Sequence, residues 1–247
     1  MSSARQVYET TGAEDTPPAE GALGKRSGSG IVPRAIVEPD RLGYHLLRPR
    51  NAGPADMPLL GEAYRCWSPA WEEHLCEREG VTRVPSDDFT RQDEIGALFH
   101  EYECIGLTGY RWVDLSRKVH QDDSYFSVWP RDAIESVCAD GSKVCIGNNL
   151  TVAAPWRNAV GCSVKELLLA LAIERFLKSD ADVLVGTMRN DRGMHSLGYR
   201  LGFRPVAQGL VFHGGPVDLV TFRRSAKREL LSPLTEAVIR NLGSSIL

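Results

Sequence analysis

The sequence predicts an α/β fold with a mixed central sheet. Segments with the two-residue alternation of strands are interspersed along the chain with segments of helical period. The clearest helix covers 163–179, where a long apolar run follows Ser163, and Ser163 with Glu166 has the pattern of a capping box. A chain of 247 residues with 43% hydrophobic and 25% charged residues has the composition of a globular protein of one domain, or one and a half.

The first half of the chain is expected to contain strands on either side of a helical segment. A strand is predicted at 43–49 and an antiparallel pair at 93–116, with its turn at 100–103. Between them, 57–80 has a helical pattern. Because proline lacks an N–H and disfavours the helix interior, this segment is predicted to form two short helices that break around Pro69.

The second half is expected to alternate between strands and helices. A short helix follows Pro130, and a strand covers 143–152, where the run Gly147-Asn148-Asn149 predicts a bulge. After the 163–179 helix come a buried strand, a helix, a final pair of strands and a C-terminal helix that is interrupted at Pro233.

Three parts are expected along the chain. Residues 1–40 are rich in Ser, Gly, Pro, Ala and charged residues, which predicts a disordered N-terminal tail. The folded domain is expected to cover 41–224, and a C-terminal helical extension to cover 225–247.

The composition argues against several classes of protein. A net charge of -3 gives no indication of nucleic-acid binding. No apolar run is long enough to span a bilayer, and the N-terminus lacks the layout of a secretion signal, so we expect a cytoplasmic protein. The six cysteines form no C-x-x-C pair and are expected to be free thiols. No Cys/His pair has the spacing of zinc ligands, and no metal is expected.

The loop before the 163–179 helix has the features of an anion site. A helix N-terminus presents unpaired N–H groups and a partial positive charge. Small residues before it allow a ligand to approach the backbone, and Arg157 adds a full positive charge that can bind phosphate with two N–H groups. The residues alone leave two interpretations open: a site for a pyrophosphate, or a tight strand-to-helix connection with a solvated Arg157.

Two motifs in this order resemble the GNAT superfamily of acyl-CoA-dependent N-acyltransferases. They are the loop Arg157–Ser163 after the strand at 143–152, and the Leu201-Gly202-Phe203 sequence at the end of a later helix. The resemblance covers about 44–224. It implies a GNAT-like, mostly antiparallel central sheet flanked by helices, in which the fourth strand splays from a later one to admit the pantetheine arm of CoA.

The resemblance also implies an activity and a ligand site. It predicts an N-acyltransferase that uses acyl-CoA or acetyl-CoA, with a small-molecule amine attacking the thioester directly, and therefore no cysteine nucleophile. The residues expected to bind the donor are Thr151, Val152, Arg157, Asn158, Ala159, Val160, Gly161, Cys162, Ser163 and Asn190.

The catalytic residues are less clearly marked, because a direct transfer needs few groups. The position of the tyrosine acid of many family members is Gly198 here, and Tyr199 lies one helical step away. We expect proton transfer near the sulfur from His195 or Tyr199, and deprotonation of the amine by Asn149 through a bound water. Glu101 and Glu103 are further candidates for the base, although a solvated turn explains both.

A narrower resemblance leads to two alternatives. The aromatic segment around Trp67 and Trp71, followed by an acidic stretch, is similar to the branch that takes acyl chains from acyl carrier protein, which includes homoserine lactone and N-acyl amino acid synthases. Asn148 and Asn149 stand where lactone synthases have a glutamate. A carrier protein would need a basic docking face, for which the chain offers Arg189, Arg192, Arg200 and Arg204. A module that binds acyl-CoA without turnover is the other alternative.

Overall fold

The computed structural model describes residues 34–80, 83–229 and 232–243. From Arg34 onward the described residues form one compact unit. The predicted tail at 1–33 lies outside the described residues. Residues 34–40, which the tail prediction included, pack on the domain, and Val37 is buried.

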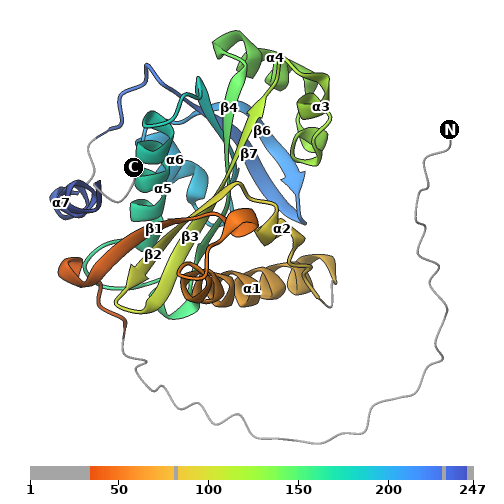
Figure 1. Cartoon of the computed structure of the whole chain (residues 1–247). Coiled ribbons are helices and arrows are strands. Elements are labelled where there is room, and N and C mark those ends of the chain that lie inside the picture. The colour runs from red at the N-terminus through yellow and green to blue at the C-terminus, as the bar shows by residue number, and fades with distance from the viewer. Residues whose placement is uncertain (1–33, 81–82, 230–231, 244–247) are drawn as a thin grey trace, which may run out of the picture. The chain divides into compact units, whose positions relative to one another are not determined.

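A seven-stranded sheet forms the centre of the described part of the chain, in the order β1-β2-β3-β4-β5-β7-β6 (Figure 1). Neighbouring strands are antiparallel except β4 and β5, which are parallel. This arrangement confirms the predicted mixed, mostly antiparallel sheet. The strands are β1 (Leu42–Leu47), β2 (Glu94–His100), β3 (Glu103–Asp114), β4 (Lys143–Val152), β5 (Val183–Arg189), β6 (Arg204–Phe212) and β7 (Gly215–Arg223).

Helices cover both faces of this sheet (Figure 1). The alternation of β2 shows the two layers: Ala97 and Phe99 belong to the apolar cluster of α1, while Leu98 between them belongs to that of α5. With α5 lie α6 and α7, and the smaller helices that follow β3 pack in a separate cluster on the sheet. The helices are α1 (Met57–Glu79), α2 (Asp87–Thr90), α3 (Lys118–Gln121), α4 (Arg131–Asp140), α5 (Val164–Leu177), α6 (Met194–Arg200) and α7 (Pro233–Leu242), with short 3-10 turns η1 (Pro39–Arg41), η2 (Pro49–Asn51), η3 (Ser124–Val128) and η4 (Ala154–Trp156).

The middle of the sheet is irregular at β4. The pairing of β3 with β4 shifts register between Leu107 and Gly109, and Asn149 has a φ of 53°. This is the bulge that the Gly147-Asn148-Asn149 run predicted, because glycine and asparagine tolerate the left-handed backbone that such irregularities require. The pairing of β4 with β5 ends at Gly147 and Gly186, although both strands continue beyond these residues. The two parallel strands therefore splay apart from the bulge onward.

Two predictions about proline were wrong. The segment 57–80 forms one continuous helix, α1, with Pro69 inside it. Proline costs a helix interior about 3 kcal/mol, but the apolar side chains of both halves, such as Trp67 and Leu75, pack in one cluster on the sheet. Pro233 does not interrupt the C-terminal helix. It is the first residue of α7, after the N-cap Ser232, where its missing N–H costs nothing.

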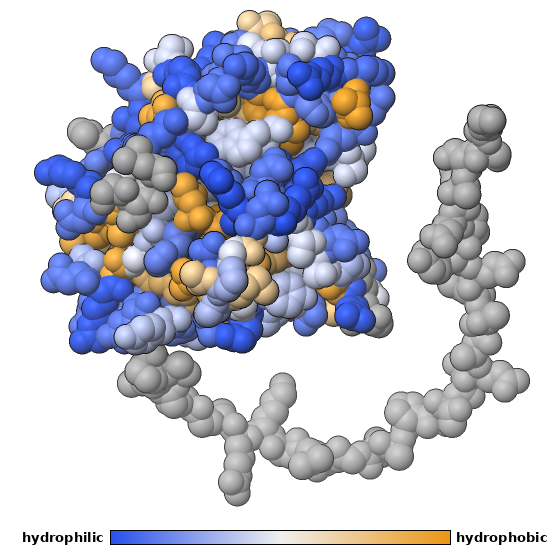
Figure 2. Space-filling model, in the orientation of Figure 1, coloured by the Kyte–Doolittle hydropathy of each residue, from blue (hydrophilic) through white to orange (hydrophobic). Residues whose placement is uncertain are grey.

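The visible surface of the domain is mixed in polarity. Figure 2 shows one face of the molecule, on which apolar side chains lie in separate patches among hydrophilic ones. No helix within the described residues is long and apolar enough to cross a membrane.

Candidate functional site

The splay of β4 and β5 opens into a cavity of about 570 Å³. Its lining comes from Gly147–Val152 on β4, from β5, from the second half of α1, from α2 and η3, and from the turn between β6 and β7. Apolar and aromatic side chains such as Trp71, Leu150 and Phe212 lie in this lining among polar and charged groups, which reach it from several elements. Since β4 has no strand partner on its β5 side after Gly147, backbone groups along this edge face the cavity region rather than another strand.

One end of the cavity is cationic. Arg157, Lys165 and Arg192 line it, and all three are at least partly exposed. The Arg157 guanidinium lies 3.0 Å from the Glu73 carboxylate on α1 and 3.3 Å from the Val152 carbonyl oxygen. Lys165 is in the first turn of α5, so its ammonium adds to the partial positive charge of the helix N-terminus. This end is suited to a ligand that carries negative charge.

The loop between Arg157 and α5 is only partly open. The N–H of Val160 donates to the Ala35 carbonyl at 2.8 Å, and the Val160 carbonyl accepts from Val37 at 2.9 Å. Gly161 has a φ of 97°, and a Cβ there would lie 2.9 Å from the Val37 carbonyl oxygen. The segment before β1 therefore covers this part of the loop, and its close approach is a structural reason for the glycine.

The predicted donor-binding residues fall into two groups. Thr151, Val152 and Arg157 line the cavity, whereas the loop residues from Asn158 to Ser163 are not in its lining. Cys162 is buried, and burial raises the pKa of its thiol, which keeps it protonated. The Ser163 side chain makes no capping hydrogen bond, in contrast to the predicted capping box. The contribution of the loop to ligand binding stays a prediction.

The second half of α1 forms a roof over the cavity and contacts both sides of the splay. Trp71 Nε1 donates to the Thr151 hydroxyl of β4 at 3.0 Å. One turn further along, His74 Nε2 accepts a hydrogen bond from Arg189 of β5 at 2.9 Å. Burial, reinforced by Arg189 and Arg192, lowers the pKa of His74 to about 4, so its imidazole is neutral near pH 7.

Charged contacts extend this roof to the end of β5. Asp191 accepts hydrogen bonds from Arg189 at 2.7 Å and from Arg78 of α1 at 2.6 Å. Hydrogen bonds from Arg189 are the main reason that the pKa of Asp191 is lowered. Two guanidinium groups and one carboxylate leave this part of the wall with a positive charge.

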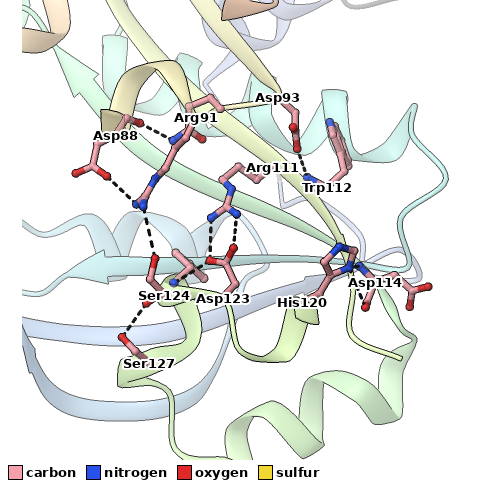
Figure 3. Close-up of polar contacts among 12 residues, drawn as sticks. Asp88, Arg91, Asp93, Arg111, Trp112, Asp114, His120, Asp123, Ser124 and Ser127 are labelled. Carbon is pink, nitrogen blue, oxygen red and sulfur yellow. Dashed lines mark hydrogen bonds and ion pairs between the residues drawn. The ribbon is translucent and has the colours of Figure 1, made fainter. Parts of the chain in front are cut away.

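The wall formed by α2 and η3 is held together by two arginines (Figure 3). Arg91 lies 2.7 Å from the Asp88 carboxylate and donates to the Ser124 hydroxyl at 3.5 Å, which connects α2 to η3. Arg111 of β3 binds both carboxylate oxygens of Asp123, and this pairing lowers the pKa of Asp123. These contacts fix Asp88, Arg91 and Ser124 in the cavity lining.

Of the predicted catalytic residues, the structure places one in the cavity. Asn149 lines it and donates from Nδ2 to the Asp88 carbonyl at 2.9 Å. His195 and Tyr199 lie together on α6, with ring centroids 5.8 Å apart, and neither is in the lining. Their roles stay predictions.

A polar cluster outside the cavity lining holds the Tyr199 hydroxyl. It donates to Asp218, which also accepts from Asn190 at 3.0 Å. Burial and the hydrogen bond to Asp218 raise the pKa of Tyr199 to about 12. Asn190 was expected to bind the donor and instead orients Asp218, so its contact with a ligand also stays a prediction.

The two candidate bases at the β2–β3 turn form their contacts outside the cavity. Glu101 pairs with Arg41 at 2.8 Å, and Glu103 accepts from Trp156 Nε1 at 3.0 Å. Neither glutamate lines the cavity. Of the two tryptophans singled out from the sequence, Trp71 lines the cavity and Trp67 is fully buried between α1 and the sheet.

Several cavity residues were missed by reasoning from sequence. Lys165 could have been found from its place in the first turn of the α5 helix. No sequence motif marks His74 or His213, because each reaches the cavity only through the packing of α1 and of the β6–β7 turn. Among the residues that the structure describes, no group of three or more His, Cys, Asp or Glu side chains is placed to hold a metal ion.

The fold of the chain is that of known acyltransferases. FeeM, an N-acyl amino acid synthase from uncultured soil microbes, superposes with a TM-score of 0.52 at 14% identity over 74% of this chain and 90% of its own. A mosquito arylalkylamine N-acetyltransferase like 5b (TM-score 0.53, 13% identity) covers 74% of this chain and 99% of its own. The acyl-homoserine lactone synthase LasI (TM-score 0.53, 13% identity) covers 77% and 98%.

These likenesses confirm the GNAT fold that the loop at Arg157 and the Leu201-Gly202-Phe203 sequence predicted. The sequence itself matches no family model, and no curated protein sequence matches it.

Proposed function

We propose that the protein is an N-acyltransferase that moves an acyl group from acyl-CoA to a small-molecule amine by direct attack on the thioester. The observation that carries this proposal is the unpaired edge of β4 beside a cavity with a cationic end. An extended pantetheine arm can pair its amides with such an edge, as a strand would. The phosphates of CoA would then lie toward Arg157 and Lys165, and the thioester toward the bulge at Asn149.

The chemistry requires positioning more than special reagents. The amine loses a proton, its nitrogen attacks the thioester carbon, and the carbon–sulfur bond breaks, after which the thiolate takes up a proton. Backbone N–H groups at the bulge of β4 are suited to stabilise the oxyanion that forms in between. Asn149 would hold a water or the amine at the cavity wall, and His195 and Tyr199 remain the predicted donors of the proton to sulfur.

The donor could be carried by a protein instead of CoA. The fold likeness to an N-acyl amino acid synthase and to a homoserine lactone synthase supports this second candidate, as do the exposed cations Arg157, Lys165 and Arg192 at the cavity. Acyl carrier proteins are acidic, and a basic surface around the entrance would attract them. The phosphopantetheine arm would occupy the same edge of β4 in both cases.

The donor is identified by incubating the protein with a panel of acyl-CoA and acyl-carrier-protein thioesters and a mixture of amines. We expect amine-dependent release of free thiol from one class of donor, and an acylated amine of matching mass in the mass spectrum. Release from carrier-protein donors alone would favour the second candidate. Tight binding of an acyl-CoA without any release would instead identify a non-catalytic acyl-CoA-binding module and contradict the proposed enzyme.

A further inference from the structure

A histidine and a carboxylate form a pair where the β6–β7 turn meets the end of α1. His213 lies in the turn between β6 and β7 and lines the cavity, as Asn149 does. Its Nδ1 is 2.8 Å from a carboxylate oxygen of Glu79, the last residue of α1. No residue assigned so far to the reaction uses this pair.

The partner of Nδ1 determines what the other ring nitrogen can do. A carboxylate can only accept a hydrogen bond, so the neutral imidazole has its proton on Nδ1 and donates it to Glu79. Nε2 then has a free lone pair, and within the described residues it has no hydrogen-bond partner. An imidazole that is oriented by a carboxylate and has a free Nε2 can act as a general base.

The backbone at this position is unusual for a histidine. His213 and Gly214 have φ values of 47° and 62°, and they connect the paired residues Phe212 and Gly215. Two consecutive left-handed residues are typical of a type I′ hairpin turn, whose first position favours asparagine, aspartate or glycine. A histidine here is less favourable for the turn, which suggests that its side chain has a use beyond the turn.

The other titratable groups of the cavity are less suited to accept a proton. The Nε2 of His74 is occupied by the Arg189 hydrogen bond, and a pKa near 4 makes the ring a weak base. Asp88 is paired with Arg91 at 2.7 Å. His74 Nδ1 has no partner either, but it carries the ring proton because Nε2 accepts from Arg189. Of the two imidazoles in the described cavity lining, His213 is thus the one with a free lone pair.

We propose that His213 is the general base that takes the proton from the acceptor amine, and that Glu79 is the positioning residue that orients its ring. This assignment rests on the proposed acyl transfer. The ammonium form of the acceptor gives one proton to Nε2 before its nitrogen attacks the thioester carbon. The second proton passes from the newly bonded nitrogen to the departing thiolate, and the imidazolium later releases the first to solvent. Asn149 then has a binding role at the bulge of β4 and not the role of the base.

Charged and titratable groups surround His213. On α1 they are His74, Arg78 and Glu79, and across the cavity end they are Arg189 and Asp191 at the end of β5. Two cations contact the turn: Arg78 donates to the Gly214 carbonyl at 2.9 Å, and the Arg189 guanidinium occupies the space that a Cβ on Gly215 would fill. The base must be neutral to act, so we expect kcat/KM to fall on the acid side of the profile.

The most informative variant is His213→Asn. Asparagine tolerates the left-handed backbone and can still donate from its amide to Glu79, but it lacks the basic nitrogen. The turn should be at least as stable, while kcat/KM for an alkylamine should fall by about 100-fold or more, within the range of general-base catalysis. The acid limb of the pH profile should disappear. A structural role would instead lower stability and activity together, with the profile unchanged in shape.

Glu79→Gln is the matched control for the positioning role. Glutamine can still accept the hydrogen bond from Nδ1, but it removes the negative charge that favours the protonated imidazole. Because the ring keeps the free lone pair on Nε2, kcat should fall less than in His213→Asn.

A pair of acceptors of the same shape separates proton removal from positioning. The probes are 2-phenylethylamine, which is protonated at neutral pH, and O-benzylhydroxylamine, whose amino group is already neutral there. If His213 is the base, His213→Asn should lose much more activity with the first probe than with the second.

Equal losses with the two probes, or full activity in His213→Asn, would overturn the assignment while leaving acyl transfer intact. If the wild-type protein transferred an acyl group to no amine of the panel, both the proposed function and the role of His213 would be contradicted.

Discussion

Replacing Arg157 with alanine is expected to weaken the binding of acetyl-CoA by about 5- to 150-fold. Hydrogen bonds between a guanidinium and an anion are worth about 1–3 kcal/mol, and each 1.4 kcal/mol is a factor of ten in Kd. The binding can be measured by calorimetry with a non-reactive thioether analogue of acetyl-CoA. Arg157 is well placed for this role because it lines the cavity next to the N-terminus of α5.

Two matched variants test whether the effect is specific to that site. Glu73 lies 3.0 Å from Arg157 and competes with a phosphate for it, so Glu73→Gln should bind the analogue more tightly. Arg131→Ala removes the same charge from an exposed position on α4 outside the cavity lining and should leave the Kd unchanged. If Arg131→Ala and Arg157→Ala changed the Kd equally, only the net charge of the protein would matter. That result would contradict a direct contact between Arg157 and a phosphate.

Replacing Trp67 with alanine is expected to lower the free energy of unfolding by about 3–5 kcal/mol, as for other buried large-to-small substitutions. Trp67 is 0% exposed, and its ring lies 5.5 Å from Phe89 and 6.4 Å from Trp71. The same side chain anchors the middle of α1 on the sheet, next to Pro69. Denaturation by urea, followed by tryptophan fluorescence and circular dichroism, gives the change.

The size of this effect depends on the cavity that the substitution leaves. Trp67→Phe keeps most of the apolar volume and should lose clearly less stability than Trp67→Ala. Tyr102→Ala, at a position 91% exposed in the β2–β3 turn, should leave the free energy of unfolding within about 0.5 kcal/mol of the wild-type value. If Trp67→Ala unfolded at the same urea concentration as wild type, the packing of α1 on the sheet would be contradicted.

The elements that hold the fold together were predicted well because their signals are local. The long helix after Ser163 and the strands around it follow hydrophobic period, which depends only on neighbours in sequence. The bulge at Asn149 was predictable because the backbone preference of Gly-Asn-Asn is local too. The GNAT fold followed from two short motifs in the right order, and the structural likenesses confirm it.

The parts that could not be predicted depend on contacts between distant segments. Pro69 stays in a continuous helix because residues on both sides of it pack in one cluster, which no local rule reports. Val37 and Val160 bond across more than a hundred residues, so the cover over the predicted phosphate loop was invisible in the sequence. The same holds for the pair of Glu79 and His213, which meet only because α1 ends at the β6–β7 turn.

The most direct measurement is a crystal structure of the protein with a non-reactive acyl-CoA thioether. We expect the pantetheine arm along the β4 edge after Gly147, the phosphates beside Arg157 and Lys165, and the thioether sulfur within reach of the bulge at Asn149. Binding of the analogue elsewhere, with the space between β4 and β5 filled by protein side chains, would contradict the account.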